Sequence, residues 1–138
     1  MSLTYWLQFR NLAELESVET DLGVLYQETQ SLDELCQNLE VPLLSSFIDS
    51  TDAAYNAGVF DDQIDPDSDE PAYTAEQMQW FLSDTGLQTF RVLRIALLEN
   101  KTALPHLNHN DRIELLEELD LCIAALEQHS EFHLELLI

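Results

Sequence analysis

Basic residues, glycine, proline and cysteine are all scarce in this sequence. Five Lys and Arg residues stand against 27 Asp and Glu residues, which gives a formal net charge of −22. Nucleic acid is therefore excluded as an expected partner, because contacts to phosphate need clustered basic side chains. Three glycines and four prolines exclude collagen-like and low-complexity chains. No apolar run approaches the roughly 18 residues that a membrane span requires, so we expect no membrane association.

Apolar residues, by contrast, are abundant and make up 46% of the 138 positions. A disordered acidic tail would contain far fewer of them, because such a tail buries no core. The length is typical of one domain and too short for two ordinary ones. We therefore expect residues 1–138 to form a single domain.

The beginning of the sequence and its two cysteines indicate a compartment. Residues 1–6 contain neither the basic stretch nor the apolar stretch of a cleavable signal peptide. Cys36 and Cys122 lie on or beside apolar positions of predicted helices, where free buried thiols are expected in a chain without an export signal. One bridge between them is the alternative. We predict free thiols and a cytoplasmic protein.

The two ends of the sequence have the alternation that is typical of β-strands. Apolar and polar residues alternate over 3–9 and again over 132–138. A two-stranded ribbon is stable only where helices cover it. The sequence therefore predicts a small sheet, formed by the N-terminal and C-terminal strands and covered by helices.

Helical periodicity dominates the rest of the sequence. Apolar residues recur three and four positions apart in five segments, which predicts helices at 12–29, 31–39, 74–84, 86–99 and 111–129. One or two loose helical turns are expected within 43–57. The predicted fold class is α+β and predominantly helical, with about five helices around a central one.

The segment 86–99 is predicted to be that central helix, because its apolar residues cover almost the whole circumference. It carries Arg91 and Arg94, three positions apart. On a central helix both guanidinium groups would be at least partly buried, and buried charges need partners. We expect structural ion pairs with carboxylates. Recognition of an anion at a pocket is the alternative.

The last helix, at 111–129, is predicted to begin after an N-cap at Asn110. Five apolar residues at helical spacing define its expected inward face, namely Ile113, Leu116, Leu119, Ile123 and Leu126. We expect this stripe to pack against the core.

Negative charge is concentrated in the first two thirds of the chain. No Lys or Arg lies between Arg10 and Arg91, whereas 18 Asp and Glu residues do. The segment 58–73 is predicted to be a long acidic loop, and long loops in compact domains are often functional. Such charge either keeps a protein soluble or attracts a basic partner. For the second hypothesis the predicted partner-binding residues are Asp61, Asp62, Asp65, Asp67, Asp69, Glu70 and Tyr73.

The same loop contains a partial calcium motif. Asp65, Asp67, Asp69 and Glu76 match positions 1, 3, 5 and 12 of an EF-hand loop, whose oxygen ligands surround Ca²⁺. Position 6, where the sharp turn requires glycine, is Glu70 instead. We therefore expect neither a metal site nor a cofactor. A metal-binding or ligand-binding domain that uses residues 61–76 is the alternative.

Catalytic motifs are not recognisable. The sequence has no Gly-x-Ser-x-Gly, no phosphate-binding glycine run and no cysteine beside an obvious base. Its histidine pairs, His106 with His109 and His129 with His133, do not supply the three or four ligands of zinc. The main hypothesis is a small acidic binding protein that engages a basic protein, by analogy with the charge of inhibitors and immunity proteins. An enzyme without a recognisable motif is the third hypothesis.

Overall fold

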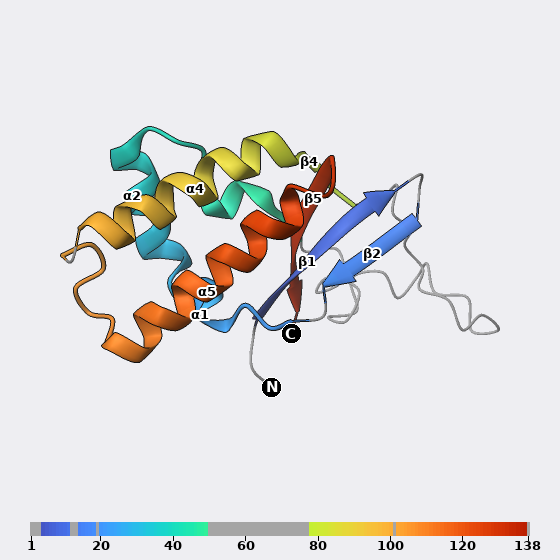
Figure 1. The fold of residues 1–138 in the computed structure, drawn as a ribbon. Helices are drawn as coiled ribbons and strands as arrows, with labels where there is room; N and C mark the ends of the chain where they lie inside the picture. The colour runs from blue at the N-terminus through green and yellow to red at the C-terminus, as the bar shows by residue number, and fades with distance from the viewer. Residues whose placement is uncertain (1–3, 12–13, 19, 50–77, 101, 138) are drawn as a thin grey trace, which may run out of the picture.

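Groups of strands and groups of helices follow one another along the part of the chain that the structure describes (Figure 1). The computed structural model describes residues 4–11, 14–18, 20–49, 78–100 and 102–137. In chain order the elements are β1 (Thr4–Asn11), β2 (Glu14–Val18), α1 (Gly23–Gln27), α2 (Thr29–Leu39), a 3₁₀ helix (Leu44–Phe47), β3 (Ile48–Asp49), β4 (Phe81–Leu82), α4 (Ser83–Glu99), α5 (His109–Leu126) and β5 (Glu131–Leu137). The fold is α+β and mostly helical, as predicted, with four α-helices among the described residues.

β1 and β5 form the middle of the sheet, and their pairing confirms the prediction for the two ends of the chain. They run antiparallel over six residue pairs, from Thr4 opposite Leu137 to Phe9 opposite Phe132. The strand order is β2-β1-β5-β3, and β4 also pairs with β5. β3 runs parallel to β5, so the sheet is mixed. It has five strands where two were predicted, because three internal segments add to it.

The predicted helix at 12–29 is wrong over residues 14–18, which form β2, and is confirmed at Gly23–Gln27 and Thr29. β2 pairs with β1 from Leu7 opposite Val18 to Asn11 opposite Glu14. The apolar spacing of this segment fits a helix, but a hairpin with a two-residue connection satisfies the hydrogen-bonding edge of β1. Strand pairing therefore overrides the helical pattern.

The predicted helix at 31–39 is confirmed as α2, which begins two residues earlier. It ends at Leu39, and Glu40 then adopts left-handed backbone angles with φ 58°. The 3₁₀ helix that follows agrees with the loose turns expected within 43–57, of which residues 50–57 lie outside the described residues.

The predicted helix at 74–84 is wrong over residues 78–82, and residues 74–77 lie outside the described part of the chain. Phe81 and Leu82 form β4, opposite Phe132 and Glu131 of β5. Pairing with a neighbouring strand decides the conformation here, because two strand residues carry no periodic signal of their own.

α4 begins at Ser83 and ends at Glu99, so it contains the helix predicted at 86–99. Its central position is not confirmed, because Ile95 and Leu98 are each 51% exposed. One side of α4 faces the core, through Gly86, Leu87, Phe90, Leu93 and Leu97. α4 therefore has two apolar sides, of which one packs against the core and the other is exposed.

α5 differs from the prediction at both ends and in its buried face. Its N-cap is Asn108 rather than Asn110, and the Asn108 side chain accepts a hydrogen bond of 2.8 Å from the Asp111 N–H. The helix ends at Leu126. Ile113, predicted to face inward, is 42% exposed. The buried positions of α5 are Leu115, Glu118, Leu119, Cys122 and Leu126.

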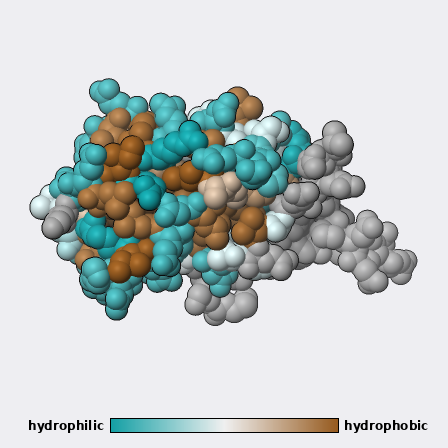
Figure 2. Space-filling view, in the orientation of Figure 1, coloured by the Kyte–Doolittle hydropathy of each residue, from teal (hydrophilic) through white to brown (hydrophobic). Residues whose placement is uncertain are grey.

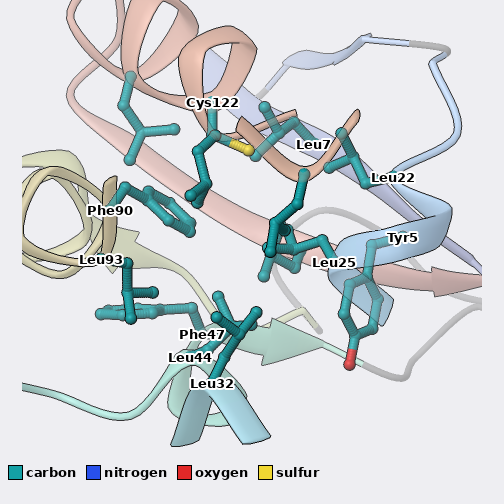
Figure 3. Packing of buried hydrophobic residues seen from close by; sticks show 14 of the residues in the cluster. Tyr5, Leu7, Leu22, Leu25, Leu32, Leu44, Phe47, Phe90, Leu93 and Cys122 are labelled. Carbon is teal, nitrogen blue, oxygen red and sulfur yellow. The ribbon is translucent and has the colours of Figure 1, made fainter. Parts of the chain in front are cut away.

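Buried side chains from the helices and from β1 and β5 form one core beside the sheet. Figure 3 shows side chains from separate elements in contact, namely Tyr5, Leu7, Leu22, Leu25, Leu32, Leu44, Phe47, Phe90, Leu93 and Cys122. The Phe132 ring of β5 lies 5.3 Å from the Phe47 ring and 6.1 Å from the Phe90 ring, centroid to centroid. Cys36 and Cys122 are both free and buried, as predicted.

A glycine allows α4 to approach β5 closely. A Cβ atom added at Gly86 would lie 2.4 Å from two ring atoms of Phe132 and 2.8 Å from Leu126. Both neighbours are buried, so moving them aside would displace other side chains of the core. Gly86→Ala is therefore expected to destabilise the protein by about 1–3 kcal/mol, despite a gain of about 1 kcal/mol in helix propensity.

Urea unfolding of Gly86→Ala beside Gly23→Ala tests this packing. Gly23 is the first residue of α1, and a Cβ there would meet nothing within 4 Å. We expect Gly23→Ala to be neutral or slightly stabilising. Equal effects of the two substitutions would contradict the close approach of α4 and β5.

Candidate functional site

The residues predicted to bind a basic partner lie outside the described part of the chain. This holds for Asp61, Asp62, Asp65, Asp67, Asp69, Glu70 and Tyr73, and for the calcium candidate Glu76. The two arginines of α4 are described, and they contact carboxylates on α5 and at its C-cap. Arg91 donates to Glu127 at 3.0 Å, and Arg94 pairs with Asp120. All four side chains are about half-exposed, so these pairs lie on the surface rather than beneath a central helix.

An acidic cleft lies between α5 and the residues that precede α1. The cleft has a volume of about 220 Å³ and is lined by Thr20, Asp21, Glu114, Glu117, Glu118 and Leu121. The α5 residues follow one another at intervals of three, one and three positions, which places them on one face of the helix. Because its lining has four carboxylates and no basic side chain, the cleft is suited to a cation.

Glu118 forms the buried base of this cleft. Its carboxylate accepts hydrogen bonds from the backbone N–H groups of Val24 at 3.3 Å and Leu25 at 3.0 Å. Both N–H groups belong to the first turn of α1. The N-cap residue of α1 makes no side-chain hydrogen bond to this turn, so Glu118 serves as the acceptor. Burial raises the pKa of Glu118, the two hydrogen bonds oppose that shift, and the charge of Glu114 adds to it. Glu118 therefore joins α5 to α1 and holds the walls of the cleft together.

The upper walls of the cleft are exposed carboxylates. Asp21 accepts a hydrogen bond of 2.8 Å from the indole N–H of Trp6, which fixes its position. Glu114 and Glu117 are exposed, and neither takes part in an ion pair among the described residues. Leu121 adds an apolar surface against which the aliphatic part of a Lys or Arg side chain can pack. The arrangement can therefore receive one basic side chain.

A second polar cluster lies at the sheet, around the buried His133. His133 of β5 is fully buried beneath Trp80, with ring centroids 4.3 Å apart. Its Nδ1 lies 2.8 Å from the Gln79 carbonyl oxygen, and its Nε2 lies 2.7 Å from Oε1 of Gln8. Asp49 accepts a hydrogen bond of 3.0 Å from the Gln79 N–H. The cluster therefore fastens residues 79–80 to the sheet.

Burial lowers the pKa of His133, whereas the nearby charge of Asp49 and the hydrogen bond to the Gln79 carbonyl oppose that shift. The net direction favours a neutral ring in the folded protein. Nδ1–H then donates to Gln79, and a half-turn of the Gln8 amide presents its nitrogen to Nε2. The geometry therefore accommodates the neutral form without loss of a hydrogen bond.

Stability should fall in acid because of this histidine. In the unfolded chain His133 takes up a proton near pH 6.5, whereas the folded protein takes it up only at lower pH. The stabilisation of the folded state by neutral His133 is thus complete above about pH 6.5. It is lost as the pH falls below that value, by up to about 1.4 kcal/mol of unfolding free energy per pH unit. Urea unfolding from pH 7.5 to 5.0, compared with His133→Gln, isolates this term from the carboxylates. Parallel pH profiles for the two proteins would contradict the assignment.

Comparisons with known proteins give no relative for this chain. No family model, no curated protein and no solved structure matches it. Among the described residues, no helix combines the length and the apolar character needed to cross a membrane. In the same part of the chain, no three His, Cys, Asp or Glu side chains lie together as a metal site would require. The calcium motif at 65–76 falls outside these residues.

Proposed function

We propose that this chain is a small acidic binding protein that engages a basic protein, in the manner of an inhibitor or immunity protein. The observation that carries the proposal is the cleft along α5. Three exposed carboxylates and the buried carboxylate of Glu118 line it, and no basic side chain does. In contrast, Arg10, Arg91 and Arg94 are each paired with a carboxylate elsewhere. The carboxylates of the cleft therefore remain available to bind a cationic group. Separately, the two buried free thiols are typical of a cytoplasmic protein.

The net charge of the chain adds a long-range electrostatic attraction to the local binding at the cleft. A chain with a formal charge of −22 attracts a basic partner over distances near the Debye length, about 10 Å at 0.1 M salt. Such steering raises the association rate more than it raises the affinity. In the proposal, the loop residues Asp61, Asp62, Asp65, Asp67, Asp69, Glu70 and Tyr73 contribute to the same attraction, and the cleft receives a basic side chain of the partner.

Neutralising the loop is expected to change binding without harming the fold. Changing Asp61, Asp62, Asp65, Asp67 and Asp69 to Asn should slow association with the basic partner, with the largest effect at low salt. The melting temperature should stay the same or rise, because self-repulsion is relieved. Stopped-flow association and thermal unfolding of the same preparations measure both effects.

The partner for this experiment is recovered from an extract of the protein's own cell at about 20 mM salt, where screening is weak. Failure to bind any basic protein at that salt would refute the proposal. A Ca²⁺-dependent rise in melting temperature that the five substitutions abolish would instead favour the metal-binding alternative.

A further inference from the structure

A groove runs between α4 and α5 on a side of the molecule that does not face the core. It has a volume of about 300 Å³ and is lined by Arg91, Arg94, Ile95, Asp120 and Ile123. Figure 2 shows hydrophobic residues gathered over α4 and α5 on this face, with strongly hydrophilic ones between them. The acidic cleft uses a different face of α5, since its glutamates lie at 114, 117 and 118.

Apolar side chains are exposed on the outer sides of α4 and α5, and one of them, Ile95, lines the groove. Ile95 and Leu98 of α4 are half-exposed, and Ile113 of α5 is nearly so. Ile113 shares an α5 stripe with Asp120 and Ile123, because the intervals of seven and three residues return to one face. The sequence pattern predicts that Ile95, Leu98 and Ile113 lie inside the protein. Their exposure indicates a surface that another molecule covers.

Charge decides which molecule fits best. The two arginines that line the groove are both neutralised by ion pairs, Arg91 with Glu127 and Arg94 with Asp120, so these four side chains sum to zero. A basic partner gains nothing here, because two arginines line the groove. Two copies of a chain with a charge of −22 repel each other over most of their surface, but not at a neutral face.

We propose that the groove is a self-association surface, in which the α4–α5 pair of one chain packs against the same pair of a second copy. α4 has 17 residues and α5 has 18, so each is about 25 Å long. Two adjacent helices are about 20 Å wide, which gives a face of roughly 500 Å² per chain. The total of about 1,000 Å² reaches the lower limit of specific interfaces, so the dimer is weak and reversible. The acidic cleft of each copy stays accessible.

Sedimentation equilibrium from about 1 to 200 µM tests the proposal, a range that suits a weak interface of this size. The wild-type protein is expected to dimerise within this range. Ile95→Glu should be monomeric, because it places a charge in the centre of the apolar contact. Ile95→Lys should be monomeric too, although it lowers the net negative charge and so reduces repulsion. Loss of the dimer in both variants can only come from loss of the apolar contact.

Leu82→Glu is the matched control, since Leu82 is an exposed leucine at the other end of α4 and the substitution adds the same charge. It should dimerise like the wild type. Ile95 is half-exposed, so its variants should keep the wild-type circular dichroism spectrum and melting temperature measured at monomeric concentration. A wild-type protein that is monomeric up to 200 µM, or a dimer that survives Ile95→Lys, would overturn the proposal.

Discussion

Deletion of residues 132–138 is expected to abolish the cooperative unfolding transition of this protein. These residues supply nearly all of β5, which pairs with β1, β3 and β4 at the same time. The deletion therefore leaves three strands without their common neighbour and removes Phe132 and Leu134 from the core. Unpaired buried backbone groups add to the loss of apolar burial. The ends of the chain are thus predicted to be essential to the fold.

Circular dichroism during urea titration measures this effect. Phe132→Ala, which keeps the strand, should retain a transition and lose about 3–5 kcal/mol of stability. Leu137→Ala, at the half-buried end of β5, should lose less. A deletion variant that unfolds with the wild-type midpoint would show that β5 does not hold the sheet together.

Glu118→Ala is expected to have another large effect, a loss of about 2–6 kcal/mol of stability. The substitution removes the only acceptor described for the N–H groups of Val24 and Leu25, among the residues that the structure covers. Each buried donor without a partner costs about 1–3 kcal/mol. α1 has only five residues, so it cannot compensate for a lost connection to α5.

Glu118→Gln separates the hydrogen bonds from the charge. The amide keeps an oxygen for Leu25, and it removes a carboxylate whose ionisation is disfavoured by burial. We therefore expect Glu118→Gln to lose less than about 1.5 kcal/mol, the usual net value of one hydrogen bond. Chemical denaturation at pH 7 gives both numbers. A larger loss for the Gln variant than for the Ala variant would contradict the capping role.

The strands at the chain ends were predictable because alternation over seven residues is a local signal. The segment 14–18 was not, because its apolar spacing fits a helix and only the partner strand decides between the two. Residues 81–82 are too short to carry any periodicity. Helix positions were predicted to within a few residues for α2, α4 and α5. The buried face of α5 was not, since that helix has apolar residues on more than one side.

Some residues of the candidate site could also have been predicted from the sequence, and others could not. Three of its glutamates share a face of α5, and their helical spacing could have been noticed in the sequence. Asp21 could not have been added, because it belongs to a segment predicted as helix. His133 occupies the polar position of an alternating strand, where an exposed side chain is the ordinary expectation. Its burial depends on Gln79 and Trp80, more than 50 residues away in the chain.

We propose that the α5 cleft recognises a basic side chain through its particular carboxylates and not through net charge alone. Two triple variants with identical charge separate these possibilities. One changes Asp21 to Asn and Glu114 and Glu117 to Gln. The other changes three exposed glutamates that lie on α2, just after it and on α4, namely Glu34, Glu40 and Glu99, to Gln.

The most direct measurement is a nuclear magnetic resonance titration of ¹⁵N-labelled protein with tri-lysine at about 20 mM salt, where screening is weak. Amide shifts are expected to concentrate at residues 20–21 and 114–121. The cleft variant should bind about five- to twelvefold more weakly, from three contacts of about 0.3–0.5 kcal/mol each. The Glu34, Glu40 and Glu99 variant should bind within twofold of the wild type. Equal affinities for the two variants, with shifts spread over all acidic surfaces, would contradict the account.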